Sequence, residues 1–173
     1  MSFDLKRPLV LVGPMGSGKS TIGKVLSKLT SLPLIDLDDE IVKKNGMSIP
    51  EIFKQFGEQG FRERETAVLK AFINEKAILS SGGGIITIAQ NRQLLKENCD
   101  CVFLKTSPKV QFARTAHDDN RPMIATDDRL SRLKSLYNDR LPFYEEVAVF
   151  AVETDEKSPK KIASLITEFI SVK

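Results

Sequence analysis

Residues 13–21, with the sequence G-P-M-G-S-G-K-S-T, carry the clearest chemical pattern in the chain. They fit G-x-x-x-x-G-K-[ST], in which glycines let the backbone curl until consecutive N–H groups point at phosphate oxygens. Lys19 can then reach the terminal phosphates of a nucleotide, and the Ser20 hydroxyl can ligate Mg²⁺. A glycine-rich turn that binds nothing is the alternative, but an apolar run before the loop and helical apolar spacing after it favour a nucleotide site. The predicted nucleotide-binding residues here are Gly16, Ser17, Gly18, Lys19, Ser20 and Thr21.

Two aspartates, Asp36 and Asp38, stand at the end of a second apolar run, residues 34–38. On a strand, this spacing places both carboxylates on the same side. One carboxylate is expected near Mg²⁺ in a phosphoryl-transfer site, and a second can orient or deprotonate an accepting hydroxyl. The alternative is an acidic cap for the helix that follows. The run at 77–80 lacks the terminal aspartate that many nucleotide-binding proteins use for Mg²⁺, which favours the functional interpretation.

Three consecutive glycines, Gly82, Gly83 and Gly84, follow the apolar run at 77–80. A flexible turn is one interpretation of this stretch. The other is that the glycines present bare backbone N–H groups to an anionic ligand at close range.

Two arginines, Arg62 and Arg140, are candidates for holding such a ligand. Two planar guanidinium groups that meet one ligand would suit a carboxylate, which each can grip with two hydrogen bonds. Arg62 and Arg64 lie on one charged helix, where a solvated face is the alternative for both, and Glu65 could pair with either of them.

Residues 117–122 are polar and show no periodicity, so we expect a loop that acts as a lid. Kinases need a lid because water that reaches the transferred phosphoryl group would hydrolyse the nucleotide. Arg121, carried on this loop, would neutralise developing charge on closure. His117 is expected to be solvated and without a role.

The composition is that of an ordinary globular protein, since 41% of the 173 residues are hydrophobic and 28% are charged. This length suits a single domain, residues 1–173. The formal charge of +3 is too small to argue for nucleic acid, and no apolar run reaches membrane-spanning length. Cys99 and Cys101 are expected to be reduced, partly buried thiols. We therefore expect a cytoplasmic protein without a signal peptide, with a monomer as the default state.

Strands and helices are expected to alternate along the whole chain. Strands are predicted at residues 8–12, 34–38, 77–80, 101–104 and 147–152. Helices are predicted at residues 21–29, 39–44, 48–57, 61–74, 89–97, 108–114, 127–144 and 160–170. Such alternation predicts an α/β fold with a parallel sheet covered on both faces, and ligands bind at the carboxyl ends of its strands.

Six segments fall in the order and spacing of the shikimate kinases: residues 13–21, 34–38, 60–65, 82–84, 120–122 and 140–144. This resemblance covers essentially the whole chain. It implies the P-loop NTPase fold of the nucleoside monophosphate kinase type, a three-layer α/β/α arrangement around five parallel strands. It also implies transfer of the γ-phosphoryl group of ATP to the 3-hydroxyl of shikimate, in the pathway to chorismate and the aromatic amino acids. A substrate-binding helical segment at about 37–64 and a lid at about 114–126 belong to the same expectation.

The resemblance also implies roles for individual residues. Asp38 holds the reacting hydroxyl as the candidate base, while Lys19 and Arg121 act on the phosphates and Ser20 and Asp36 serve Mg²⁺. The residues implied to hold shikimate are Asp38, Phe53, Phe61, Arg62, Glu65, Gly82, Gly83, Gly84 and Arg140. Those implied on the adenine side of ATP are Arg114, Lys157 and Pro159. The family often has arginine at the position of Lys157, and lysine keeps the charge but lacks the planar fork.

Another small-molecule kinase, acting on a sugar acid or a nucleotide, is the nearest alternative function. Adenylate-type kinases tend to read G-K-G-T where this chain has G-K-S-T, and a sugar-acid kinase would not need residues 60–62 together with 82–84. A regulatory GTPase is disfavoured because the chain lacks N-K-x-D. A binding module without catalysis would be expected to lack Lys19, Asp38 or Arg121.

Overall fold

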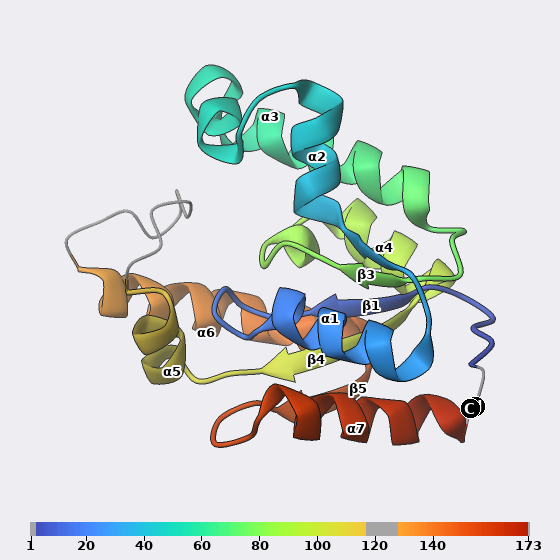
Figure 1. Cartoon of the computed structure of the whole chain (residues 1–173). Helices are drawn as coiled ribbons and strands as arrows, with labels where there is room; N and C mark the ends of the chain where they lie inside the picture. Colours follow the sequence, from blue (N-terminus) through green and yellow to red (C-terminus); the bar gives the residue numbers. More distant parts are fainter. Residues whose placement is uncertain (1–2, 117–127, 173) are drawn as a thin grey trace.

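One parallel sheet organises the protein, whose computed structural model describes residues 3–116 and 128–172 (Figure 1). Its five strands lie in the order β2-β3-β1-β4-β5. The strands are β1 (Leu9–Val12), β2 (Leu34–Asp36), β3 (Ile78–Ser80), β4 (Asp100–Lys105) and β5 (Ala148–Glu153). The helices are α1 (Lys19–Thr30), α2 (Leu37–Asn45), α3 (Ile49–Phe72), the short 3₁₀ helix η1 (Ile85–Thr87), α4 (Ala89–Asn98), α5 (Pro108–Arg114), α6 (Arg129–Val147) and α7 (Pro159–Ser171). The predicted α/β class with a five-stranded parallel sheet is confirmed.

The central strand β1 shows why helices cover both faces of the sheet. All four of its residues are buried, and successive side chains of a strand point to opposite faces. Val10 and Val12 join one apolar cluster, with residues of α2, α3, α4 and α6. Leu9 and Leu11 join the other, with residues of α1 and α7. The sheet is therefore the middle layer of three.

Helix α3 begins as its sequence predicts but extends beyond its predicted end. Ser48 accepts a hydrogen bond from the Glu51 N–H, and the Glu51 carboxylate accepts one from the Ser48 N–H, which forms a capping box. Gly57, predicted as a helix end, is instead a kink with φ of 71° inside a longer helix. Glycine adopts such a φ without steric cost, so the chain turns there and continues as a second helical piece that carries Arg62.

Two expectations about element ends are wrong. The second strand stops at Asp36 and is a half-buried edge strand, because α2 begins at Leu37. The helix predicted to end at residue 144 continues to Val147, so Arg140 and Pro142 stand within α6. The lid residues 117–122 lie outside the described part of the chain.

Within residues 3–116 and 128–172, no helix is long and apolar enough to span a membrane. Both cysteines are free thiols and are more buried than expected, with 2% of Cys99 and none of Cys101 exposed.

Candidate active site

The loop between β1 and α1 has the backbone shape that its glycines predict. Gly16 and Gly18 have φ values of 79° and 90°, a region that residues with side chains rarely adopt. A Cβ atom on Gly16 would also lie 3.1 Å from the Gln111 Cα atom in α5. The loop is thus a tight backbone cradle at the start of a helix, where phosphate groups bind.

Lys19 lies across this cradle. Its amino group donates hydrogen bonds to the carbonyl oxygens of Gly13, at 2.6 Å, and Pro14, at 3.0 Å. A cavity of about 300 Å³ opens beside it. The residues lining that cavity are Gly16, Gly18, Lys19, Ser20, Thr21, Asp36, Asp38, Ser80, Ser81, Arg114 and Thr115. Ser17, the other predicted residue of the loop, is fully buried beneath it.

Asp36 caps α2 and also contacts the phosphate-binding loop. Its Oδ1 atom caps α2 by accepting hydrogen bonds from the N–H groups of Asp38, at 3.0 Å, and Asp39, at 3.2 Å. Its Oδ2 atom accepts a hydrogen bond from the Ser20 hydroxyl at 3.2 Å. Asp38 therefore stands in the first turn of α2 rather than on a strand, and both aspartates still line the cavity.

The donor set at Ser20 and Asp36 fits Mg²⁺. No cluster of three or more His, Cys, Asp or Glu side chains suited to a metal occurs in residues 3–116 and 128–172. Mg²⁺ does not need one, because it usually binds one or two carboxylates and takes its other oxygens from phosphates and water. One hydroxyl and one carboxylate oxygen beside a phosphate cradle match that preference.

The glycine stretch 82–84 lies between the nucleotide cavity and a second group of charged residues. A Cβ on Gly82 would be 3.0 Å from Asp38 Oδ1 and 3.1 Å from Glu65 Oε2. A Cβ on Gly83 would be 3.3 Å from the backbone nitrogen of Met15 in the phosphate-binding loop. The absence of side chains is what lets these groups approach one another.

Arg62 lies against the last of these glycines, since a Cβ on Gly84 would be 2.6 Å from the Arg62 Cζ atom. Only 7% of Arg62 is exposed, and its Nη1 atom donates to Glu65 Oε1 at 2.8 Å. Glu58 is a second, longer partner at 3.8 Å. Two buried atoms, Arg62 Nε and Glu65 Oε2, have no hydrogen-bond partner among the described residues. Buried groups of this kind point to a ligand.

Burial raises the pKa of Glu65 to about 7, against the opposing influence of Arg62, which favours the carboxylate. For Arg140, 6% exposed, burial is also the main cause of a lowered pKa, and the positive charge of Arg62 adds to it. No carboxylate of the described residues lies within 4.0 Å of the Arg140 guanidinium. Arg62 is thus paired with Glu65 and, at longer range, with Glu58, whereas Arg140 has no such carboxylate partner among the described residues, so an anion can bind beside Arg140.

Two aromatic rings pack beside Arg62. The ring centroids of Phe53 and Phe61 are 4.7 Å apart. The Arg62 guanidinium carbon lies 5.1 Å from the Phe61 ring centroid. By contrast, Arg64 stacks on Phe56 and bonds to Asn45, which makes it a structural residue.

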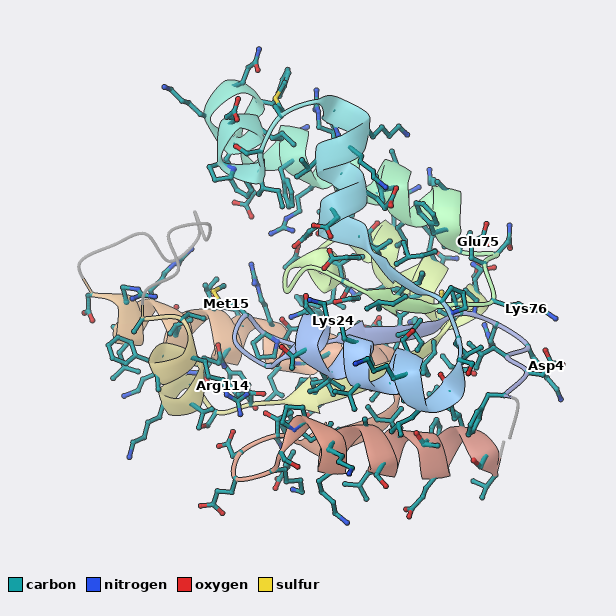
Figure 2. All side chains as sticks on the ribbon, viewed as in Figure 1. Asp4, Met15, Lys24, Glu75, Lys76 and Arg114 are labelled. Carbon is teal, nitrogen blue, oxygen red and sulfur yellow. The ribbon has the colours of Figure 1, made fainter. Side chains whose placement is uncertain are left out.

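All of these groups gather at the carboxyl ends of the strands. Figure 2 labels Met15 and Arg114 at this end of the molecule, whereas Asp4, Glu75 and Lys76 lie at the opposite end. The strands β1 and β3 begin at that opposite end, where the Lys76 amino group lies 3.9 Å from the Asp4 carboxylate.

On the side predicted to hold adenine, Arg114 donates a hydrogen bond to the Gly16 carbonyl at 2.9 Å and reaches the Thr154 hydroxyl at 3.4 Å. Lys157 stands in the turn before α7, and the exposed Pro159 is the first residue of that helix. Arg114 lines the nucleotide cavity, whereas Lys157 and Pro159 are not among its lining residues. Arg121 lies outside the described residues.

Sequence reasoning missed several residues of the site. Ser80 and Ser81 line the nucleotide cavity, and their position at the end of the strand beside β1 was a usable signal. Tyr144 was noted only within a motif, yet its hydroxyl donates a hydrogen bond to the Gly83 carbonyl. No local pattern indicates that contact, which joins residues 61 positions apart.

Comparison with known proteins gives one consistent result. The family model described as shikimate kinase matches residues 15–171. The shikimate kinase of Thioalkalivibrio sulfidiphilus is 45% identical over 162 residues, which cover 93% of this chain and 85% of that protein. A solved shikimate kinase from Acinetobacter baumannii, in complex with shikimate, has a TM-score of 0.93 and 41% identity, covering 96% of this chain and 93% of that one. The Aquifex aeolicus shikimate kinase has a TM-score of 0.82 and 32% identity, covering 95% and 96%.

Proposed function

The chain belongs to the shikimate kinase family, and we propose that it transfers the γ-phosphoryl group of ATP to the 3-hydroxyl of shikimate by means of the residues assembled above. The products are shikimate 3-phosphate and ADP, on the route to chorismate and the aromatic amino acids.

One observation supports this assignment above the others. Two buried arginines, Arg62 and Arg140, lie beside a glycine stretch that itself contacts the phosphate-binding loop. Glu65 and, at longer range, Glu58 pair with Arg62, but no carboxylate of the described residues lies within 4.0 Å of Arg140, and a planar carboxylate is the best geometric match for its fork. A substrate held there by its carboxylate would present its hydroxyls toward Asp38 and the nucleotide cavity.

The chemistry follows from position and charge. ATP lies with its phosphates in the cradle of residues 13–21, and Lys19 neutralises charge on the transferred group. Asp38 accepts a hydrogen bond from the 3-hydroxyl, orients its oxygen in line with the γ-phosphorus and takes its proton. Ser20 and Asp36 would hold Mg²⁺, which would neutralise part of the negative charge on the phosphates. Because phosphoryl transfer has a loose transition state, positioning matters more than the basicity of Asp38.

Arg121 is proposed as the lid arginine that approaches the phosphates on closure, within a lid at residues 114–126. Arg114, Lys157 and Pro159 are proposed to flank the nucleotide base and ribose. Residues 37–64 are proposed as the substrate-binding segment of a single domain, and Phe53 and Phe61 as walls of the shikimate pocket.

The enzyme is proposed to act as a cytoplasmic monomer. Its two free thiols suit a reducing compartment, where ATP is also available. Light scattering coupled to size exclusion would measure the mass, for which the monomer value is 19.3 kDa.

The decisive experiment is an ADP-release assay with shikimate, gluconate and AMP offered in turn. Turnover with shikimate alone is the expected result. Preferential turnover of gluconate or AMP would replace this proposal with a sugar-acid kinase or a nucleotide kinase. The variant Arg62→Lys supplies a point charge in place of a fork, so the KM for shikimate should rise while the KM for ATP stays near the wild-type value.

A further inference from the structure

Tyr144 is a fully buried side chain at the centre of the substrate side of the site. Its ring stacks on Phe103 of β4, with centroids 4.9 Å apart and planes inclined by 16°. This stack fixes the ring against the sheet. The remaining polar atom, the phenolic oxygen, is therefore held in one place.

That oxygen connects two elements of the carboxylate site. It donates a hydrogen bond to the carbonyl oxygen of Gly83. Arg140 precedes Tyr144 by four residues on the same face of α6, and the phenol beside it favours the charged form of its guanidinium. One hydroxyl thus joins α6, next to Arg140, to the glycine stretch between β3 and η1.

We propose that Tyr144 is a positioning residue that sets both halves of the carboxylate site, the Arg140 fork and the peptide that follows Gly83. This role rests on the proposed function. In a trans peptide the C=O and the next N–H point in opposite directions. A carbonyl of Gly83 held by Tyr144 therefore fixes the direction of the Gly84 N–H, beside Arg62.

A tyrosine suits this position better than a carboxylate would. Arg140 already lies near the positive charge of Arg62 and is buried, and both effects lower its pKa. A carboxylate partner would neutralise Arg140 and cancel the attraction for an anionic substrate. Burial raises the pKa of Tyr144 to about 12, so the phenol stays neutral and orients the guanidinium while leaving its charge for the ligand.

The test is Tyr144→Phe, which keeps the stacked ring and removes only the hydroxyl. Tyr137→Phe, on the same helix and away from these contacts, is the matched control. Loss of the phenol beside a charged group predicts a rise of about tenfold or more in the KM for shikimate, with the KM for ATP within about twofold. With shikimate methyl ester, which has no carboxylate charge, the variant and the wild type should differ by less than about twofold.

A variant with wild-type KM for shikimate would overturn the positioning role, and so would equal losses for shikimate, its methyl ester and ATP. If Tyr144→Phe does not fold, Arg140→Lys is measured in its place, with the wild type and Tyr137→Phe as references. Equal effects of Arg140→Lys on the KM values for shikimate and for its methyl ester would also overturn the proposal. A wild type that does not phosphorylate shikimate refutes the proposed function instead, so the two failures are distinguishable.

Discussion

Replacing Gly84 with alanine should damage shikimate binding without touching ATP. The Gly84 backbone has φ of −96° and ψ of 7°, which alanine tolerates, so the substitution strains no dihedral angle. The added methyl group would, however, lie 2.6 Å from Arg62 Cζ and 2.7 Å from Arg62 Nη1. Carbon atoms in ordinary contact are about 3.5 to 4.0 Å apart, so the guanidinium must move by about 1 Å.

That displacement has a calculable consequence. Arg62 Nη1 donates to Glu65 at 2.8 Å, and a shift of about 1 Å takes the pair beyond hydrogen-bond distance. The displaced guanidinium also loses its alignment with the carboxylate of shikimate, and a hydrogen bond to a charged group contributes about 1.5–3 kcal/mol. Since about 1.4 kcal/mol is tenfold in affinity, the KM for shikimate should rise by about 10- to 100-fold. The melting temperature should also fall by a few degrees, because the buried Arg62–Glu65 hydrogen bond is lost.

The assay is ADP release at saturating ATP over a range of shikimate concentrations, with ATP affinity measured separately by calorimetry. A double-mutant cycle with Arg62→Ala isolates the cause. Once the guanidinium is gone, Gly84→Ala should have no further effect on shikimate. Additive effects in the cycle, or a single variant that binds shikimate normally, would refute the reasoning from the Gly84–Arg62 contact.

Three further outcomes are expected. Asp38→Asn should bind ATP with nearly wild-type affinity in calorimetry but lose about 10²- to 10⁴-fold in turnover, and near-normal turnover would contradict its role as base. Because the pKa of Glu65 is raised from 4.5 to about 7, the folded state holds a proton that the unfolded chain has lost between those values. The free energy of unfolding should therefore fall by roughly 3 kcal/mol as pH rises through this window, and urea titrations of Glu65→Gln should lack that step. Burial also raises the pKa of both Cys99 and Cys101, so a thiol reagent should react at the rate of unfolding, and fast reaction of the folded protein would count against their burial.

Local features of this protein were predictable because they depend on short-range backbone chemistry. The phosphate-binding loop has positive φ at Gly16 and Gly18; the motif requires the glycine at position 18, and the sequence supplies another at its variable position 16. The capping box at Ser48 and Glu51 is a contact between residues three apart. Apolar periodicity likewise predicted each strand of the sheet, although element ends shifted by a few residues.

The different roles of Arg62 and Arg64 could be assigned only from the fold. Arg62 and Arg64 stand two apart on one helix, and nothing local separates them. The kink at Gly57 and the side-chain-free surface at Gly84 allow Arg62 to be buried in the site. Arg64 instead stacks on Phe56 near the surface.

The sequence by itself determined the nucleotide cradle and the family through motif spacing, and the α/β class through the alternation of strands and helices. Only the tertiary structure decided that Asp36 caps a helix with one oxygen and meets Ser20 with the other, and that the Tyr144 hydroxyl reaches the Gly83 carbonyl. The physical reason is separation along the chain. A hydroxyl meets a carbonyl 61 residues away only after the sheet has brought their strands and helices together.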